Sequence, residues 1–190
     1  GRWPNLTLRE TIMIFANTAP AYWNAGLPVI PLCKNSKVPA LKRDETFIPA
    51  EFNQQWLTDY ADGNIGMLLG DVSGVTVLDI DIQGGLSAFI QTALSGSISW
   101  IRCGHRGKAL AFKYEGDKPF RIFSVTGKLV CEVLPEQTQI VLAPSLHPTT
   151  LQPYVENYPL YEADLKPLPE GIEEILRKVV ADYEETYGAI

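Results

Sequence analysis

The spacing of hydrophobic residues changes along the chain from a mostly helical period to a mostly strand-like period. Apolar positions at helical spacing predict one helix that begins near residue 8, behind the capping pattern Thr7–Glu10, and another across Pro49–Tyr60. A further short helix is expected between Thr18 and Gly26. Pro20 separates it from the first helix, because proline lacks the N–H group that a helix interior uses.

Short runs of apolar and β-branched residues predict the strands. They cover residues 27–32, 65–69, 75–82, 98–103, 108–114, 120–125, 129–134 and 138–142. Helices are expected at Gly85–Leu94 and at Pro169–Tyr187, the second with an apolar side formed by Ile172, Ile175, Leu176 and Val179. A proline-rich loop is expected over residues 143–169. This order of elements indicates an α+β fold with a mixed or largely antiparallel sheet flanked by helices.

Length and composition fit a globular domain, with 190 residues of which 46% are hydrophobic and 20% charged. No apolar run approaches the ~20 residues that a membrane helix needs, so we expect no membrane contact. The first residues lack the pattern of a signal peptide. Cys33, Cys103 and Cys131 are odd in number and show no C-x-x-C spacing, which predicts unpaired packing thiols in a reducing cytoplasm.

The net charge of −6 is unevenly distributed. Residues 155–190 hold nine acidic and three basic residues, and this segment accounts for the whole excess of negative charge. By contrast, residues 102–128 hold seven basic residues and two acids, and residues 34–43 hold four basic residues and no acid. Local fields guide a charged ligand more than the total charge does. The charge pattern therefore permits a phosphate-rich ligand but does not predict tight non-specific DNA binding.

Two aspartates stand at the end of the apolar strand predicted over residues 75–82. Because strand side chains alternate between faces, Asp79 and Asp81 point to the same side, ~6.5–7 Å apart along the strand. Two carboxylates on a sheet repel each other, and a divalent cation relieves that repulsion. The pattern therefore fits a site for Mg²⁺ or Mn²⁺, and it fits solvated acids at a strand end as well.

A third acid, Glu132, lies in the middle of the predicted strand 129–134 with apolar neighbours on both sides. Glutamate is disfavoured at such a position unless something uses it. One alternative is an ion pair with a neighbouring Arg or Lys. The other is that Glu132 joins Asp79 and Asp81 as the third ligand of a two-metal site for phosphoryl chemistry.

Two further groups of residues suit a phosphate-bearing ligand. The glycine-containing turn between the strands 98–103 and 108–114 carries Arg102, His105, Arg106 and Lys108, and clustered cations of this kind can hold a triphosphate. A basic turn is also common as a solvated surface feature. Downstream, His147 lies on a loop with prolines, where it is either a loop anchor or a contact to sugar or phosphate.

The order of these motifs resembles the bifunctional primase/polymerase (prim-pol) domain of the archaeo-eukaryotic primase superfamily. The resemblance covers roughly residues 18–155 and rests on the segments Ala25–Leu32, Lys37–Pro39, Asn64–Gly70, Val77–Asp81, Gly104–Phe112, Cys131–Val133, Ala143–His147 and Pro153-Tyr154. It implies an RRM-related α+β fold, and it suggests a prim-pol domain at 18–165 between an N-terminal helical extension at 1–17 and an acidic C-terminal helix at 166–190.

The resemblance also implies an activity, namely template-directed nucleotidyl transfer as a DNA primase or DNA polymerase in the replication of mobile elements. Two Mg²⁺ or Mn²⁺ ions would be held by Asp79, Asp81 and Glu132. Nucleoside triphosphates, single-stranded DNA or primer-template, and a fused or associated helicase are the implied partners. The residues expected to contact the nucleotide are Arg102, His105, Lys108, Ser145 and His147, and those expected to contact nucleic acid are Lys34, Lys37, Lys42 and Arg43.

One position departs from the family pattern. Many members have Gly-Gly-x-His before an apolar strand, with the histidine on the nucleotide phosphates, whereas this chain has Ala109 at that place. Lys108 together with Arg102, or else His105, would then hold the phosphates. A catalytically weak nucleic-acid-binding or replication-initiation module is the main alternative, and exposed aromatic residues on the sheet would favour it. A two-metal nuclease would use the same three acids.

Overall fold

The computed structural model describes residues 13–42 and 53–190, which form two compact units. The first unit comprises residues up to Leu68 together with Gln139–Val155, and the second comprises Leu69–Thr138 together with Glu156–Ile190. The helix predicted near residue 8 and the basic residue Arg43 lie outside the described residues.

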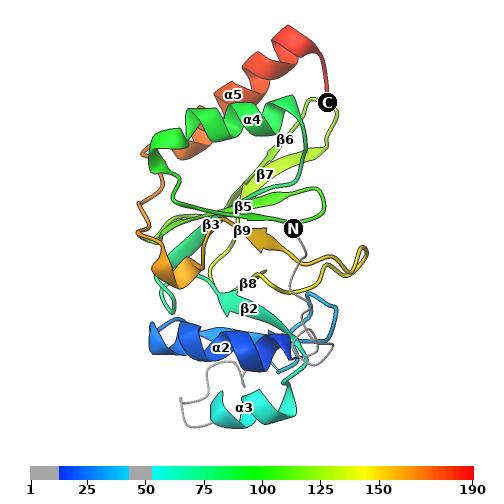
Figure 1. Cartoon of the computed structure of the whole chain (residues 1–190). Coiled ribbons are helices and arrows are strands. Elements are labelled where there is room, and N and C mark those ends of the chain that lie inside the picture. Colours follow the sequence, from blue (N-terminus) through cyan, green and yellow to red (C-terminus); the bar gives the residue numbers. More distant parts are fainter. Residues whose placement is uncertain (1–12, 43–52) are drawn as a thin grey trace, which may run out of the picture. The chain divides into compact units, whose positions relative to one another are not determined.

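The first unit is built on a three-stranded antiparallel sheet in the order β1-β2-β8. Its strands are β1 (Val29–Leu32), β2 (Asn64–Leu68) and β8 (Gln139–Val141), all three within or beside predicted strands. Two helices, α2 (Ile14–Asn24) and α3 (Asn53–Asp59), belong to this unit (Figure 1). They bury Phe15, Ala19, Tyr22 and Trp56.

The prediction that Pro20 separates two helices is wrong, because α2 runs through it without interruption. A proline inside a helix removes one backbone hydrogen bond and crowds the preceding turn. Packing of the helix compensates for this loss, since Ala19 beside the proline is fully buried and Tyr22 is nearly so. The predicted end of the helix is confirmed: Gly26 follows it with φ of +79°, a conformation that glycine adopts without steric cost.

The second unit contains a six-stranded sheet in the order β6-β7-β3-β5-β4-β9. The neighbours from β6 to β4 pair antiparallel, which confirms the predicted α+β class with an antiparallel sheet. The strands are β3 (Val75–Ile80), β4 (Trp100–Cys103), β5 (Lys108–Lys113), β6 (Phe120–Phe123), β7 (Leu129–Val133) and β9 (Val155–Glu156). The short β9 lies in the segment for which the sequence predicts a loop.

Helices α4 (Gly85–Ala93) and α5 (Ile172–Tyr187) cover one face of this sheet (Figure 1). Between them and the sheet lies a core that includes Leu78, Ile80, Leu110, Phe112, Cys131, Val133, Leu86, Ile90, Leu176 and Val180. Two short 3₁₀ segments, η3 (Ser95–Ser97) and η4 (Leu160–Glu162), complete the unit. The apolar side predicted for α5 is right for Leu176 but wrong for Ile175, which is 36% exposed.

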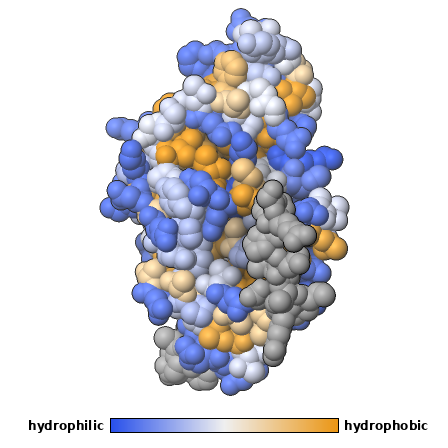
Figure 2. Space-filling model, viewed as in Figure 1, coloured by the Kyte–Doolittle hydropathy of each residue, from blue (hydrophilic) through white to orange (hydrophobic). Residues whose placement is uncertain are grey.

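The even-numbered residues of β3 enter this core, and the odd-numbered residues therefore face the opposite side of the sheet. This alternation places Asp79 on the face that α4 and α5 leave uncovered. The face of the molecule in Figure 2 is mostly hydrophilic, with hydrophobic residues in separate patches. Within residues 13–42 and 53–190, no helix combines the length and the apolar character that crossing a membrane would require.

Candidate metal and nucleotide site

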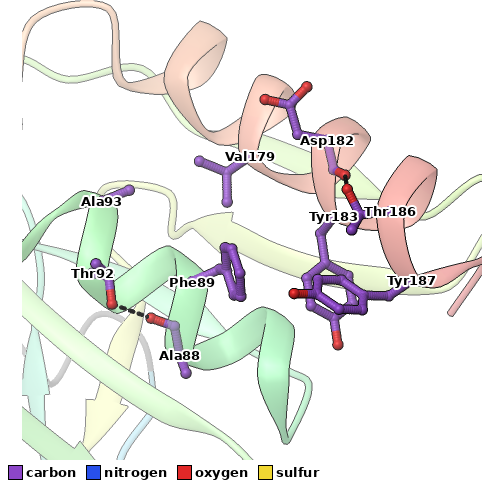
Figure 3. A pocket seen from close by; sticks show the side chains of 9 residues that line it. All are labelled: Ala88, Phe89, Thr92, Ala93, Val179, Asp182, Tyr183, Thr186 and Tyr187. Carbon is purple, nitrogen blue, oxygen red and sulfur yellow. Dashed lines mark hydrogen bonds between the residues drawn. The ribbon is translucent and has the colours of Figure 1, made fainter.

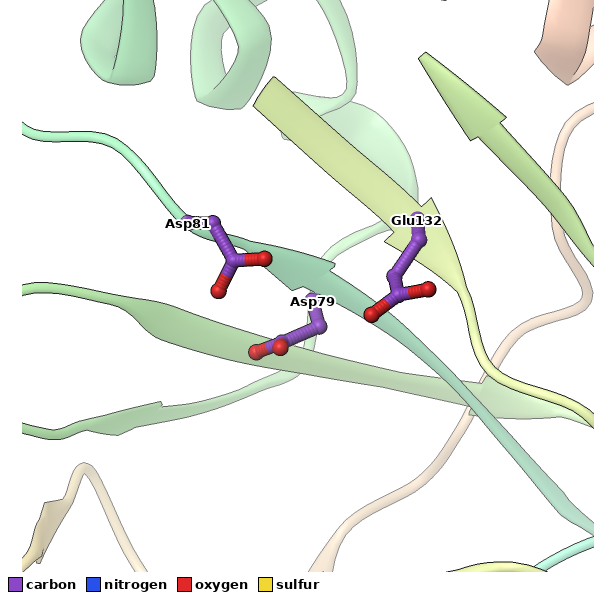
Figure 4. A group of neighbouring side chains, drawn as sticks. All are labelled: Asp79, Asp81 and Glu132. Atoms are coloured by element: carbon purple, nitrogen blue, oxygen red, sulfur yellow. The ribbon is translucent and has the colours of Figure 1, made fainter. Parts of the chain in front are cut away.

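Three carboxylates meet on the face of the six-stranded sheet opposite to α4 and α5. Asp79 lies in β3, Asp81 directly follows the same strand, and Glu132 lies in the neighbouring β7. The strand register places Asp79 directly opposite Glu132, so the two side chains point to the same face. Figure 4 shows the three carboxyl groups directed into one shared space. The alternation of strand side chains, together with this cross-strand pairing, explains why these acids converge.

The group has the geometry of a candidate cation site. One carboxylate oxygen from each of Asp79, Asp81 and Glu132 lies within 4.8 Å of the others. Asp79 and Glu132 are partly buried, whereas Asp81 is exposed. Hard divalent cations such as Mg²⁺ and Mn²⁺ prefer oxygen ligands and use carboxylates together with substrate phosphates. The donor set therefore fits these ions.

Glu132 also forms the ion pair that was the alternative explanation for its position. Nε of Arg121 in β6 donates to Oε2 of Glu132 at 3.0 Å. The side chain of Glu132 is 15% exposed and that of Arg121 is 66% exposed. The ion pair and a role as metal ligand are therefore compatible, because the carboxylate of Glu132 lies in the acid group and its charge is partly balanced by the solvent-facing Arg121. The sequence gives no signal for Arg121 as a site residue, since only the strand register brings it opposite Glu132.

The basic turn lies against the end of β3, next to Asp81. A Cβ added to Gly107 would come within 2.7 Å of the backbone oxygen of Ile80 and within 3.9 Å of Cα of Asp81. Glycine is therefore required for the turn to approach the strand this closely. The approach brings His105, Arg106 and Lys108 to the end of the sheet where Asp81 is exposed.

A polar pocket of about 280 Å³ lies between this turn and the start of α4. Its lining includes His105, Arg106 and Lys108 from the turn and contains no Asp or Glu among the described residues. Ser87 and Gln91 from α4 and Gln83 from the preceding loop supply uncharged polar groups. The N-terminal end of a helix carries partial positive charge, which adds to that of the basic side chains. The pocket suits an anion, and its lining residues Ile82 and Gln83 directly follow Asp81.

The register separates Lys108 from Arg102, the two residues that were expected to hold the phosphates together in place of the family histidine. Ala109 lies opposite Asp79 on one side and opposite Arg102 on the other, so Arg102 shares the face of the acids. Lys108 lies opposite Ile80, whose side chain belongs to the helix-covered core. Lys108 therefore begins on the other face, toward the polar pocket. Arg102 lies within β4, as the predicted strand 98–103 has it, but it is only 9% exposed and so is not displayed to solvent.

Ser145 and His147 belong to the first unit. The buried hydroxyl of Ser145 accepts a hydrogen bond from N of Ile65 at 2.9 Å and donates one to O of Ile65 at 3.2 Å. Nδ1 of His147 accepts a hydrogen bond from the backbone N of Thr149 at 3.1 Å. Both residues thus have local anchoring roles, and their contact with a nucleotide remains a prediction, which the geometry of Ser145 does not support.

The basic residues expected to contact nucleic acid lie on the loop after β1. Lys34, Lys37 and Lys42 are exposed, and Nζ of Lys34 lies 3.8 Å from a carboxylate oxygen of Asp62. Such an exposed pair contributes little to stability and leaves the lysine able to change partners. The exposure is compatible with the predicted role but does not test it.

The cysteines are unpaired, as predicted, but they differ in their surroundings. Cys131 is fully buried beside Glu132, and burial, together with the negative charge of Asp81, raises the pKa of its thiol to about 12. This thiol is therefore protonated and unreactive at neutral pH. Cys33 is exposed, so the prediction that all three are packing residues is wrong for it.

A larger hollow, of about 500 Å³, lies between α4 and α5 (Figure 3). Phe89, Tyr183 and Tyr187 line it with their rings in mutual contact. No basic residue is among the described residues that line it. It lies on the helices that cover the opposite face of the sheet from the three acids. Size alone would make it the first choice for a ligand site, but its chemistry does not suit a triphosphate.

A comparison with models of known protein families identifies the family of this chain. The family model for the bifunctional DNA primase/polymerase N-terminal domain matches residues 19–171, which include all three acids and the whole basic turn. No curated protein matches the sequence. The match spans most of the chain and includes the segments on which the resemblance rested. The chain therefore belongs to the Prim-Pol family of bifunctional DNA primase/polymerase domains.

Proposed function

We propose that this domain catalyses template-directed nucleotidyl transfer to a 3′-hydroxyl, as a DNA primase or DNA polymerase that uses two divalent metal ions. The observation that carries the proposal is the convergence of Asp79, Asp81 and Glu132, with one oxygen from each within 4.8 Å of the others. Family membership supports the reaction class, because the family is described as bifunctional DNA primase/polymerase. The number of ions and the role in replication are part of the proposal.

The three carboxylates would hold Mg²⁺ or Mn²⁺ on the face of the sheet opposite to α4 and α5. When bound, such ions lower the pKa of an attacking hydroxyl and neutralise charge on a triphosphate. The protein must keep the carboxylates in place without the ions. Strand pairing holds Asp79 opposite Glu132, and the ion pair with Arg121 at 3.0 Å anchors Glu132 from the next strand.

The basic groups would orient the triphosphate. Arg102 lies on the acid face, and His105, Arg106 and Lys108 line the polar pocket beside Asp81. A triphosphate that extends from the acids into this pocket would meet positive charge along its length. Catalysis of this kind depends on positioning and charge neutralisation more than on covalent chemistry by the protein. Lys34, Lys37 and Lys42 are proposed to contact the template, and a helicase is a proposed partner in the cytoplasm.

The alternative of a nucleic-acid-binding module that stacks bases on the sheet receives little support. Two aromatic residues of the central strands, Trp100 and Phe112, are fully buried. Phe123, in the edge strand β6, is 50% exposed. A platform for several bases needs more than one accessible ring. The described strands therefore do not offer the stacking surface that this alternative requires.

Extension of a labelled primer-template with dNTPs and Mn²⁺ tests the proposal. We expect the wild-type protein to extend the primer and the Asp79→Ala/Asp81→Ala variant to lose extension. Arg106→Gln, which removes one cation from the pocket and leaves the acids intact, should weaken extension mainly by raising KM for the nucleotide.

Three other results would contradict parts of the proposal. Extension by the double variant at the wild-type rate would exclude these acids as the catalytic group. Cleavage of the strand in the absence of nucleotides would indicate a two-metal nuclease. DNA binding without extension and without metal-dependent nucleotide binding would indicate the binding module.

A further inference from the structure

One row of paired residues crosses the face of the six-stranded sheet that is opposite to α4 and α5. From β6 to β4 the strand register places in line Arg121, Glu132, Asp79, Ala109 and Arg102. Neighbouring strands lie ~4.8 Å apart, so the Cα atoms of Asp79 and Arg102 are separated by about 10 Å with only a methyl group between them. An arginine side chain is long enough to cross much of that space. Arg102 is therefore placed to meet a phosphate held beside the acids.

The row continues to β9, the strand next to β4. Nε1 of Trp100 in β4 donates a hydrogen bond to Oε2 of Glu156 in β9 at 3.2 Å. Trp100 lies two residues before Arg102, so both side chains share the face of the acids. Asn157 fixes β9 in place, since its N donates to O of Ile101 and its Oδ1 accepts from N of Ile101, each at 3.2 Å. The carboxylate of Glu156 is thus anchored beside Arg102.

Glu156 and Arg102 influence each other electrostatically. Arg102 is 9% exposed, and a cation buried to this degree is costly unless negative charge lies near it. The pKa of Glu156 is raised to about 7, chiefly by burial of the carboxyl group. The hydrogen bond from Trp100 and the positive charge of Arg102 lower this pKa, whereas the negative charge of Glu162 raises it. The ionised and neutral forms of Glu156 are therefore both populated near neutral pH.

We propose that Glu156 is the counter-ion of Arg102 and regulates how strongly that arginine binds the nucleotide triphosphate. The ionised carboxylate neutralises the guanidinium and holds it toward β9. When the carboxyl group is protonated, the positive charge of Arg102 is available to bind the phosphates. Glu156 is thus a positioning residue that acts through Arg102, and the inference rests on the proposed nucleotide site.

The consequence for binding has a definite sign. Above pH 7 the wild-type carboxylate is ionised and competes with the phosphates for Arg102, whereas below pH 6 it is neutral. Glu156→Gln keeps an acceptor for Nε1 of Trp100 but removes the charge at every pH. This variant should therefore bind Mn²⁺·dATP more tightly than the wild type at pH 8, by about three- to tenfold, the effect of a partly buried charge pair. At pH 6 the two proteins should bind equally.

Calorimetric titration of Mn²⁺·dATP at pH 6 and pH 8 measures this difference. At each pH, the affinity of Glu156→Gln is divided by that of the wild type, because this ratio cancels the effect of titration of the nucleotide itself. Arg102→Gln, alone and combined with Glu156→Gln, tests whether the effect passes through the arginine. In the Arg102→Gln background, Glu156→Gln should have no effect on affinity. An equal effect in both backgrounds, or no difference between wild type and Glu156→Gln at pH 8, would overturn the proposal. Arg102→Met, which removes the charge but keeps a long side chain, serves if Arg102→Gln does not fold.

The pairing can also be tested without nucleotide, which separates it from the proposed function. Carbon NMR of ¹³C-labelled Glu gives the pKa of Glu156 directly in the metal-free protein. Because the charge of Arg102 lowers this pKa, Arg102→Gln should raise it above the wild-type value of about 7, and Arg102→Lys should change it less. An unchanged pKa in Arg102→Gln would refute the pairing. An altered pKa with no binding of Mn²⁺·dATP by the wild type would refute the proposed function instead.

Discussion

The strongest test of the acid group is the stability of the protein without metal. Asp79→Asn replaces the central carboxylate with a neutral group of the same shape. With oxygens of the three acids within 4.8 Å of one another, two unit charges repel by about 3.5 kcal/mol at an effective dielectric constant of about 20 and by about 0.9 kcal/mol in water. Asp79 has two such neighbours, and Arg121 offsets part of the repulsion at Glu132. We therefore expect Asp79→Asn to stabilise the metal-free protein by about 1–3 kcal/mol.

Thermal and urea unfolding in EDTA and in Mn²⁺ provide the measurement. In EDTA, Asp79→Asn should unfold at a higher temperature than the wild type. Mn²⁺ should raise the wild-type Tm, by an amount equivalent to about 2.7 kcal/mol when the ion is at 100 times its Kd. The same concentration should raise the Tm of Asp79→Asn much less, because a ligand has been lost. Addition of the metal should therefore bring the Tm values of the two proteins together or make the wild type the more stable of the two.

Glu185→Gln is the matched control, since it removes one negative charge from an exposed position on α5. It should change Tm little in EDTA and preserve the full response to Mn²⁺. A lower stability of Asp79→Asn in EDTA would show that the acids are not held in mutual repulsion. An undiminished response of Asp79→Asn to Mn²⁺ would show that the ion binds elsewhere, and either result would refute the reasoning.

Three further predictions concern single residues. Since the pKa of Glu156 is raised from 4.5 to about 7, its favourable contribution is present below pH 4.5 and is lost as pH rises through 7. Glu156→Gln should therefore gain about 1–3 kcal/mol over the wild type between pH 5 and pH 8 in urea unfolding, and a pH-independent difference would contradict this. Gly107→Ala places a Cβ 2.7 Å from O of Ile80. It should cost about 1–3 kcal/mol of stability and weaken Mn²⁺·dATP binding in calorimetry, whereas unchanged affinity would separate the turn from the site. Ser145→Ala leaves N of Ile65 buried without its acceptor and should lower the unfolding free energy by about 1–3 kcal/mol. A change below about 0.5 kcal/mol would show that this hydrogen bond contributes little.

The sequence by itself determined the local elements and the identity of the acids. Alternation of side chains is a property of any strand, so the pattern of residues 75–82 is enough to predict Asp79 and Asp81 on one face. The helix α4 and the strands β3 to β8 follow from runs of apolar residues bounded by turn residues, and the structure places them within a few residues of the prediction. The order of motifs was enough to indicate the family, which the family comparison confirms.

Other features depended on contacts between residues far apart in the chain. The uninterrupted passage of α2 through Pro20 depends on burial of its neighbours, which outweighs the lost hydrogen bond. The exposure of Ile175 depends on how α5 packs against α4 and the sheet. The short strand β9 carries too little local signal to be recognised from sequence, and only its position beside β4 identifies it.

The set of residues that share a face with the three acids was decided by strand register, a property of the whole sheet. Register brings Glu132 opposite Asp79, adds Arg121 to the row, and places Arg102 on the acid face. It also turns Lys108 toward the other face, although this residue and Arg102 are equally plausible in the sequence. The physical reason is that a shift of one residue in strand pairing moves every side chain to the opposite face, and no local pattern encodes that pairing. The sequence therefore predicts which residues are candidates for the site, and the tertiary structure determines which of them lie together.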